Sequence, residues 1–343
     1  MENKIEFQEY NPSLESYYRA IILFGRNVAS YKFALGKSLL ELAEKDKTHI
    51  SLDELAVPFS RHVCEHLKDA PKQCTNKNSA FINACDQFNK GEITNDELLD
   101  IAVSNGFNYV IDAFHIVNET ETPVKFYEKD YSRGKKQIIL TDNLYKLKDN
   151  PFSDNLYEET ESRWNLVETA WELGINKNLL NVKYDSQNEI LFVDDSFRRK
   201  DVTSVRGALD GYQKGKCFYC YDDIRVSEED GTCDVDHFFP HVLQPYMTDI
   251  NLDGVWNLVL TCQNCNRGTN GKFAKVPAIK YLERLYKRNE YLISSHHPLR
   301  ETIIKQTGLT PQARHDYLAK VDKRAIENLI IRWEIEPRGD ATF

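Results

Sequence analysis

Apolar residues recur every three or four positions through the first third of the chain, which is the period of one buried helix face. The first such run includes Leu14, Tyr17, Tyr18, Ile21 and Ile22. In the same region, Ser51–Glu54 and Thr94–Glu97 match the capping-box pattern that begins a helix. Asn105-Gly106 interrupts a later run and predicts a turn or a helix break. We therefore predict a mainly helical region over residues 13–120.

The pattern changes near Pro123, where shorter apolar runs replace the helical period. Two hairpins are predicted, at residues 124–127 with 137–140 and at residues 181–184 with 189–193. The polar stretch 149–160 predicts a loop. Helices are predicted at residues 160–173, 201–212, 276–293 and 311–333. This mixture of separate helices and small hairpins indicates an α+β fold.

The composition is that of an ordinary globular protein, with 41% apolar and 28% charged residues among 343. It argues against a disordered or collagen-like chain. At roughly 100–200 residues per domain, the length suggests two or three domains. No apolar run approaches the ~18–20 residues of a membrane span, and residues 1–6 carry no signal-peptide pattern. We therefore expect a cytoplasmic protein without a membrane partner.

Eight cysteines are present, and four of them form two C-x-x-C pairs, Cys217/Cys220 and Cys262/Cys265. Disulfides are rare inside cells, so clustered cysteines there indicate metal binding or catalysis. Four thiolates complete a tetrahedral zinc shell with no open position, which predicts a structural Zn²⁺ site. For the four scattered cysteines we expect small buried apolar side chains.

The 41 residues between the two pairs contain further chemistry. They include Asp234-Val235-Asp236-His237-Phe238-Phe239-Pro240 and Trp256-Asn257-Leu258, and Asn266-Arg267-Gly268 follows the last cysteine. In this order, the residues resemble the HNH (ββα-metal) endonucleases with two zinc knuckles, and the HNH domain of RNA-guided CRISPR nucleases. The resemblance covers about residues 215–280, and residues 1–200 resemble no family that we recognise. It implies hydrolysis of DNA phosphodiester bonds by a ββα-metal domain.

Each motif residue suits a role in that reaction. His237 is predicted as the general base, because an imidazole can accept a proton at neutral pH. Asp236 offers a hard oxygen ligand for Mg²⁺ or Mn²⁺, and the resemblance implies that Asn266 completes the metal site. Adjacent strand residues point to opposite faces, so Asp236 and His237 can take different partners. Asn257, which matches the middle asparagine of the family, is expected to brace the loop that carries His237.

Arg267, Lys272 and Lys275 follow the motif closely and are predicted to contact phosphates. A solvated surface charge is the competing interpretation for each. The tyrosines between residues 281 and 291 could stack on bases, but we favour a buried helix face for most of them. We read His241 as a solvated or packing residue rather than a second ligand, and Asp234 as either a second-sphere group or a turn cap.

Two look-alike motifs lie in the helical region. His62-Val63-Cys64-Glu65-His66 fits the H-x-x-E-H pattern of inverted zinc peptidases, but a pattern this short arises easily by chance. We interpret its histidines as ordinary helical residues. Gly36-Lys37-Ser38 resembles the end of a P-loop, yet Tyr31 stands where that motif requires glycine, so no ATP site is predicted.

The formal charge of −9 argues by itself against nucleic-acid binding by bulk charge. Residues 201–343 carry 19 Lys and Arg against 20 Asp and Glu, which leaves 25 against 33 for residues 1–200. Residues 266–314 carry ten basic and three acidic residues. The acidity therefore lies in the N-terminal region, and a local affinity for DNA remains compatible with the total. The acidic region is expected to dock a protein partner or to shield the nuclease.

We divide the chain into three parts on this basis. Residues 1–122 form a helical domain for recognition or partner docking, residues 123–200 a mixed α/β connecting region, and residues 201–343 the zinc-stabilised HNH nuclease domain with C-terminal helices. A single site of this kind cuts one strand, so we expect nicking by a monomer and double-strand cuts through a homodimer or paired nicks. The layout resembles restriction or phage-defence (antiviral) effectors. The alternatives are a non-catalytic, zinc-stabilised DNA- or protein-binding adaptor and a peptidase that uses residues 62–66.

Overall fold

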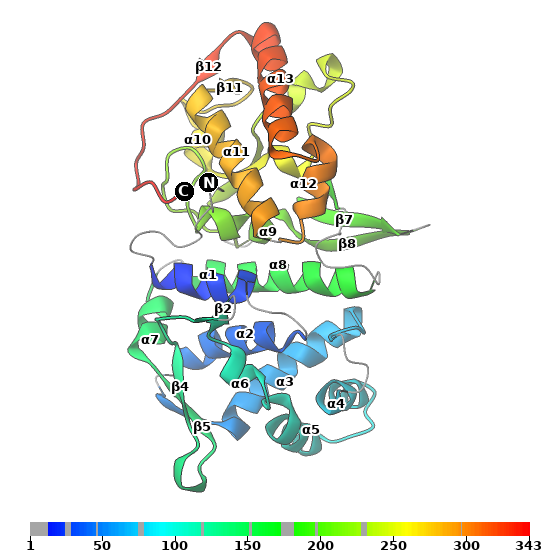
Figure 1. Ribbon diagram of the computed structural model, residues 1–343, viewed down its shortest axis with the longest axis vertical. Helices are drawn as coiled ribbons and strands as arrows, with labels where there is room; N and C mark the ends of the chain where they lie inside the picture. The colour runs from blue at the N-terminus through cyan, green and yellow to red at the C-terminus, as the bar shows by residue number, and fades with distance from the viewer. Residues whose placement is uncertain are drawn as a thin grey trace. The chain divides into compact units, whose positions relative to one another are not determined.

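The computed structural model describes residues 13–24, 29–45, 47–74, 79–117, 120–150, 153–172, 182–195, 198–227, 232–295 and 297–343. It combines helices with small sheets, in agreement with the α+β expectation (Figure 1). The described chain divides into an N-terminal unit, within residues 6–174, and a C-terminal unit, within residues 175–343. The division falls inside the stretch 123–200 that we expected as a connecting region, and each unit takes part of it.

Helices form most of the N-terminal unit, as the apolar period predicted. They are α1 (Leu14–Phe24), α2 (Tyr31–Ala43), α3 (Leu52–Asp69), α4 (Ala80–Asn89), α5 (Asn95–Ile101), α6 (Val110–Ala113), α7 (Asp142–Lys148) and α8 (Ser153–Glu172). Both predicted capping boxes are confirmed, at Ser51 for α3 and at Thr94 for α5. The break predicted near Gly106 is a short π-helix, η1 (Ala102–Gly106), at the end of α5.

The core of this unit is built around α2, which is buried almost all round. Phe33 of α2 stacks on Trp164 of α8, with ring centroids 5.9 Å apart. A fully buried side chain of this size stabilises the fold by roughly 1.5–3 kcal/mol. Gly36 of α2 lies against side chains of α1, because a Cβ atom there would meet the Tyr18 hydroxyl at 2.8 Å. Gly36 therefore has a packing role, which fits the absence of a P-loop prediction.

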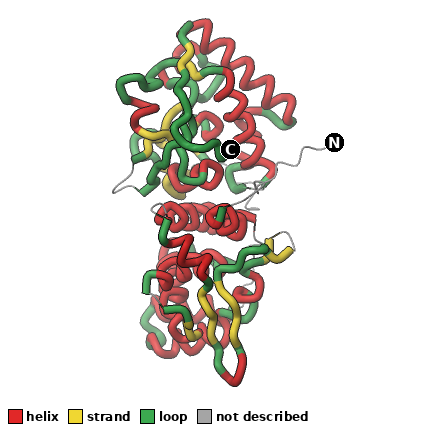
Figure 2. Tube along the Cα trace, turned by 90° about the vertical axis from the view of Figure 1, so that its left-hand side faces the viewer, coloured by secondary structure: helices red, strands yellow, loops and turns green. Residues whose placement is uncertain are grey.

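The described strands of the N-terminal unit form two small antiparallel sheets. They are β1 (His49–Ser51), β5 (Gln137–Leu140) and β4 (Tyr127–Asp130), in that order, and the pair β2 (Ile116–Val117) and β3 (Thr120–Glu121). Figure 2 shows β4 and β5 side by side, with the short helix η2 (Ser132–Gly134) at their tip. The strand predicted at 124–127 lies three residues later, at 127–130. Side chains hold the preceding backbone away from the ladder, since Thr141 Oγ1 donates to Lys125 O at 2.7 Å.

The loop predicted at residues 149–160 is wrong for residues 153–160, which form the first turns of α8. The polar residues that suggested a loop have partners inside the fold. Glu159 accepts hydrogen bonds from Arg19 of α1, at 2.8 Å from Nε and 2.7 Å from Nη2, and both side chains are buried. A buried ion pair of this kind makes a packed helix face look hydrophilic in sequence.

The C-terminal unit begins with a three-stranded sheet and a helix. The sheet is β6 (Lys183–Asp185), β7 (Ile190–Asp195) and β8 (Arg198–Ser204), and the helix is α9 (Val205–Gln213). The hairpin predicted at residues 181–184 with 189–193 is confirmed, because β6 and β7 pair antiparallel. Residue 181 of this hairpin and residue 173 of the helix predicted at 160–173 lie outside the described residues. The helix expected at 201–212 begins at Val205, because the residues before it pair with β7.

The rest of the C-terminal unit carries the two cysteine pairs and the last helices. Its elements are β9 (Cys233–His237), β10 (Leu258–Cys262), α10 (Gln263–Arg267), β11 (Val276–Pro277), α11 (Ile279–Ser294), α12 (Arg300–Thr307), α13 (Pro311–Leu329) and β12 (Arg332–Trp333). β9 pairs with β10 antiparallel, and β11 pairs with β12 in parallel. No helix in the described parts of the chain is long and apolar enough to cross a membrane.

Polar side chains from α9 and α11 form hydrogen bonds to the backbone of β10 and of the loop before it. Gln213 of α9 donates to Leu260 O at 2.7 Å and accepts from Leu260 N at 2.9 Å, so its amide continues the hydrogen bonding of β10. Arg288 and Asn289 of α11 both donate to Trp256 O, at 3.0 and 3.2 Å. The loop that precedes β10 is therefore held by buried hydrogen bonds.

Candidate functional site

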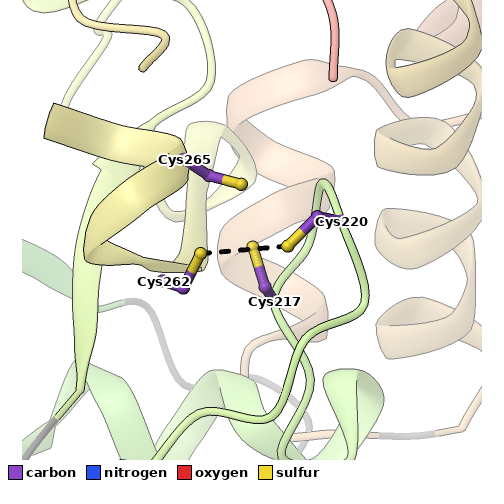
Figure 3. A group of neighbouring side chains, drawn as sticks. All are labelled: Cys217, Cys220, Cys262 and Cys265. Atoms are coloured by element: carbon purple, nitrogen blue, oxygen red, sulfur yellow. Dashed lines mark hydrogen bonds between the residues drawn. The ribbon is translucent and has the colours of Figure 1, made fainter. Parts of the chain in front are cut away.

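The four cysteines of the C-x-x-C pairs converge in the C-terminal unit (Figure 3). Cys217 and Cys220 lie on the turn after α9, Cys262 ends β10, and Cys265 lies on α10. All four are buried, and their sulfur atoms lie within 4.8 Å of one another. Among the described residues they are the one group of three or more Cys, His, Asp or Glu side chains close enough to hold a metal ion.

The sulfur geometry fits zinc. Tetrahedral Zn–S bonds of about 2.3 Å place sulfur atoms about 3.8 Å apart. Cys220 Sγ and Cys262 Sγ are 3.8 Å apart. Burial raises the pKa of the Cys217 thiol, so a cation is needed for this sulfur to act as a thiolate. The four buried cysteines can therefore hold one structural Zn²⁺, with no position open for a substrate.

Next to the zinc knuckles, the β9–β10 ladder presents two chemically different faces. Asp234 and Asp236 share one face of β9, and His237 lies on the other, as expected for adjacent strand residues. α10, which follows β10 directly, packs against both strands. The order strand, strand, helix places the motif residues on three neighbouring elements.

Asp236 is buried and both of its carboxylate oxygens have partners. Tyr219, between the first two cysteines, donates its hydroxyl to Oδ2 at 2.9 Å. Lys272 donates from Nζ to Oδ1 at 2.9 Å, and its side chain is 0% exposed. Lys272 was predicted as a phosphate contact. That interpretation is wrong for this structure, because the ammonium group is used inside the fold.

Asn266, the other predicted ligand of a catalytic metal, lies on α10 and faces the same side of β9. Its Nδ2 donates to Asp234 Oδ2 at 3.0 Å. Arg267 also pairs with Asp234, at 3.0 Å from Nε, while its side chain stays 60% exposed. Asp234 thus orients both residues that follow the last cysteine. The oxygen atoms of Asp236 and Asn266 are of the type that Mg²⁺ prefers, although in this structure Asp236 is paired with Lys272.

His237 is oriented by a residue that the sequence analysis did not single out. Its Nε2 lies 2.8 Å from Asp253 Oδ1, and the second oxygen of Asp253 lies 3.5 Å from His241 Nε2. The ring of Tyr184, on β6, lies 6.0 Å from the His237 ring. Burial lowers the pKa of His237 and outweighs the raising effect of Asp253, so the imidazole is neutral at pH 7. A neutral imidazole can act as a proton acceptor.

Asn257 is fully buried in η5 (Val255–Asn257) and bonds to the backbone on both sides of the His237 loop. Its Oδ1 accepts from Phe239 N at 2.8 Å, and its Nδ2 donates to Phe239 O at 3.0 Å and Leu252 O at 2.9 Å. These bonds tie the residues after His237 to the segment that contains Asp253. Asn257 thus has the geometry of a brace.

Three of the ten basic residues in the stretch 266–314 are buried, namely Lys272, Arg288 and Arg314, whereas Arg267, Lys280, Lys287 and Lys305 are exposed. Arg288 is 1% exposed and Arg314 4% exposed, and Arg314 pairs with Glu290. Tyr281 and Tyr291 are buried, which confirms the buried-face interpretation for these two tyrosines. Lys275 is half-buried and donates to Gly271 O at 3.3 Å. Of the three predicted phosphate contacts, Arg267 is the most exposed.

The H-x-x-E-H look-alike lies on α3 in the N-terminal unit, and its histidines face separate carboxylates. His62 Nε2 lies 2.6 Å from Glu41. His66 contacts Glu168 through Nδ1 at 2.8 Å and Glu161 through Nε2 at 3.2 Å. Both ring nitrogens of His66 are therefore occupied by ion pairs. Neither histidine belongs to a metal-ligating group among the residues that the structure describes.

The C-terminal unit thus gathers the motif residues on β9, η5 and α10, beside the zinc knuckles. Asp253, Tyr219 and Tyr184 complete their surroundings and carry no motif that marks them in sequence. No protein-family model, curated protein or solved structure matches this chain. Function is therefore inferred from the side chains of this region and their contacts.

Proposed function

We propose that the C-terminal unit is a metal-dependent HNH endonuclease that hydrolyses DNA phosphodiester bonds. The observation that supports this most is the placement of a neutral, carboxylate-oriented His237 beside Asp236, on opposite faces of the end of β9. Phosphodiester hydrolysis needs an activated water and a cation at the phosphate. The two residues suit these two tasks.

In this mechanism, His237 accepts a proton from the attacking water. Asp253 holds Nε2, so Nδ1 is the nitrogen left to face the water. Asp236 and Asn266 would hold the divalent cation, Mg²⁺ or Mn²⁺, which supplies positive charge at the scissile phosphate. Asn257 keeps the His237 loop in place, and Arg267, with its exposed guanidinium, contacts the DNA backbone.

The zinc ion has a separate, structural role in this proposal. Cys265 and Asn266 are neighbours on α10, and Tyr219 lies between Cys217 and Cys220. Zinc at the four cysteines therefore fixes the positions of Asn266 and of the Tyr219 hydroxyl that bonds to Asp236. Its loss removes the frame of the site rather than a reacting group.

A plasmid nicking assay tests the proposed activity. Zinc-loaded protein is incubated with supercoiled plasmid in Mg²⁺, in Mn²⁺ and in metal-free buffer without a chelator, so that the structural zinc stays in place. We expect relaxed circles with either added metal and none without, and no early linear product from dilute protein, since one site cuts one strand. Immediate linear product would contradict nicking by a monomer, and cleavage without added metal would contradict the metal requirement.

A non-catalytic adaptor is the second candidate, and one observation favours it. The Asp236 carboxylate is already neutralised by Lys272 inside the fold, as in a purely structural ion pair. An adaptor would bind DNA or protein and leave plasmid intact in Mg²⁺ and Mn²⁺. DNA binding without any cleavage would therefore select this candidate.

The biological role we propose is that of a restriction or phage-defence effector in the cytoplasm. The N-terminal unit would supply recognition, partner docking or restraint, and the excess of acidic residues in residues 1–200 suits a basic partner. A helicase, methyltransferase or nucleotide-signalling gene beside its own would support this role. Neighbouring genes of unrelated metabolism would count against it.

A further inference from the structure

The ammonium group of Lys272 lies beside Asp236 and donates all three of its hydrogens to acceptors of the protein. Nζ donates to Asp236 Oδ1 at 2.9 Å, to His237 O at 2.9 Å and to Phe273 O at 3.3 Å. An ammonium group has three donors, and three acceptors surround it here. The pair is buried, with the Lys272 side chain 0% and the Asp236 side chain 7% exposed.

The loop that carries Lys272 is folded back onto the zinc knuckle. Lys272 N donates to Cys265 O at 2.7 Å, and Phe273 N donates to Asn266 O at 2.9 Å. Gly271 permits this approach, because a Cβ atom there would lie 2.8 Å from Asn266 O. Phe273 has a φ of +46°, which is costly for a residue with a side chain and persists only where the surroundings enforce it. The position of Lys272 is therefore fixed by the same α10 that carries Asn266.

We propose that Lys272 is a built-in counter-cation of Asp236, and that a divalent metal ion binds there only when this ammonium group leaves. The inference rests on the proposed function, which makes Asp236 a metal ligand. Both oxygens of the carboxylate are in use, one with Tyr219 and one with Lys272. A divalent cation held by Asp236 would lie close to the buried ammonium group of Lys272, where like charges repel strongly.

The consequence is a metal site that is weak in the resting protein. A divalent ion must displace the buried, fully hydrogen-bonded ammonium group of Lys272 before it can bind the Asp236 carboxylate. Removal of the positive charge, with the length of the side chain preserved, removes the competitor. Lys272→Met is this change, and Lys272→Arg is the matched control because it keeps the charge.

Binding of Mn²⁺ to the zinc-loaded full chain, measured by electron paramagnetic resonance without DNA, tests the inference. We expect Lys272→Met to bind Mn²⁺ at least tenfold more tightly than the wild type, and Lys272→Arg to stay close to it. Asp236→Asn and the double variant Asp236→Asn/Lys272→Met should lose this site. Equal or weaker binding by Lys272→Met, with the site still lost in Asp236→Asn, would overturn the competition.

A second measurement on the wild type covers the case in which Lys272→Met does not fold, since an unpaired buried carboxylate is strongly destabilising. A lysine-selective acylating reagent and peptide mass spectrometry report the accessibility of Lys272. We expect slow labelling without metal and faster labelling of Lys272 at saturating Mn²⁺. Labelling that Mn²⁺ leaves unchanged, although Mn²⁺ binds at Asp236, would overturn the inference.

The inference and the proposed function fail in different ways. Metal-dependent nicking with no effect of Lys272 on Mn²⁺ binding leaves the nuclease intact and refutes the competition alone. The absence of both Mn²⁺ binding and nicking in every folded variant refutes the nuclease, and the competition with it. Binding that survives in the double variant places the ion elsewhere and refutes the assignment of Asp236.

Discussion

At the scale of single residues, His237 depends on one neighbour for the orientation of its ring. Asp253 lies 2.8 Å from its Nε2, at the other end of a loop that Asn257 closes. The motif pattern could place His237 and Asn257, because residue types and their order carry that resemblance. It could not identify Asp253 as a functional residue. A single aspartate in a loop matches no motif, and only the fold shows that it contacts His237.

We expect Asp253→Ala to slow plasmid nicking by roughly ten- to a hundredfold, the usual cost of losing the partner that orients a functional histidine. DNA affinity should stay unchanged, because Asp253 faces His237 and His241 rather than the DNA contacts. Steady-state nicking rates and a gel-shift titration measure the two quantities. Asp249→Ala is the matched control, as this exposed carboxylate pairs with Arg324 instead. A fully active Asp253→Ala variant would contradict the orienting role.

Asn257 offers a test of stability rather than rate. Asn257→Ala leaves Phe239 N, Phe239 O and Leu252 O without their buried partner. We expect a loss of roughly 2–4 kcal/mol in the free energy of unfolding of the C-terminal unit. Denaturant unfolding measures this, with the exposed Asn264→Ala as control. Equal stability of the two variants would show that the bonds to the His237 loop contribute little.

The burial of Lys272 could not be predicted from the sequence. Its charge and its nearness to the motif suggested a phosphate contact, and the structure buries it against Asp236. Separation along the sequence could not show this, because Lys272 is buried by a loop, residues 268–275, that returns to α10 through backbone hydrogen bonds.

At the scale of elements, the periodic signals were the reliable ones. The capping boxes at Ser51 and Thr94 are confirmed, and α11 and α13 form most of the helices predicted at 276–293 and 311–333. The predicted ends are wrong at residues 276–277 and 332–333, which pair as the strands β11 and β12. The start of α8 was missed because its polar residues pair inside the fold, as Glu159 does with Arg19. Tertiary ion pairs of this kind hide a helix from any pattern based on hydrophobicity.

The zinc knuckles allow a prediction about whole elements. We expect one zinc per chain by elemental analysis, and selective unfolding of the C-terminal unit when a chelator or Cys220→Ser removes it. The N-terminal unit has its own core and should persist as a protease-resistant fragment. Cys233→Ser is the control, because Cys233 lies opposite Cys262 in the ladder but outside the four-cysteine group. Unchanged melting without zinc would contradict a structural site.

The pairing of α3 with α8 makes the stability of the N-terminal unit depend on pH. Burial alone would lower the pKa of His66, but its hydrogen bonds to Glu161 and Glu168 outweigh this and raise it to about 9. Burial would raise the pKa of Glu161, but hydrogen bonding to His66 and the positive charges of His66 and Lys37 lower it to about 2. The histidine contribution is complete below pH 6.5 and is lost as pH rises through 9. The glutamate contribution is complete above pH 4.5 and is lost as pH falls through 2.

We therefore expect the charge on His66 to contribute on the order of 3 kcal/mol to the free energy of unfolding at pH 6.5, and this contribution to be lost as pH rises to about 9. Tryptophan fluorescence follows the unfolding, because Trp164 stacks on His66 with centroids 3.5 Å apart. The difference in unfolding free energy between the wild type and His66→Gln should shrink as pH rises from 6.5 to 9. A difference that stays constant over this range would contradict a charged His66.

At the scale of the whole molecule, the acidic excess and the proposed nuclease lie in different parts of the sequence. Most of the acidic excess belongs to residues 1–200, and three of the ten basic residues in the stretch 266–314 are buried, among them Arg314, which pairs with Glu290. Composition alone could show the first fact but not the second. Because the chain is acidic in total and three basic residues of this stretch are buried, we expect DNA contacts of the proposed nuclease to be local and not to depend on bulk charge.

The affinity for DNA should accordingly depend only weakly on salt. We expect the logarithm of the association constant to fall with a slope of about −1 to −3 against the logarithm of salt concentration, since few phosphates are neutralised. Fluorescence anisotropy with a labelled duplex, in Ca²⁺ to prevent cleavage, measures the slope. A slope steeper than about −6 would indicate a large basic surface and contradict this account.

The central claim is that His237 activates water for the cleavage of DNA, and one comparison tests it most directly. Plasmid nicking in Mg²⁺ is measured for the wild type, His237→Ala and His315→Ala, where His315 is an exposed histidine on α13. All three proteins are first shown to be folded and loaded with zinc. We predict a loss of at least a hundredfold in nicking for His237→Ala and none for His315→Ala. Undiminished nicking by a folded His237→Ala protein would contradict the claim.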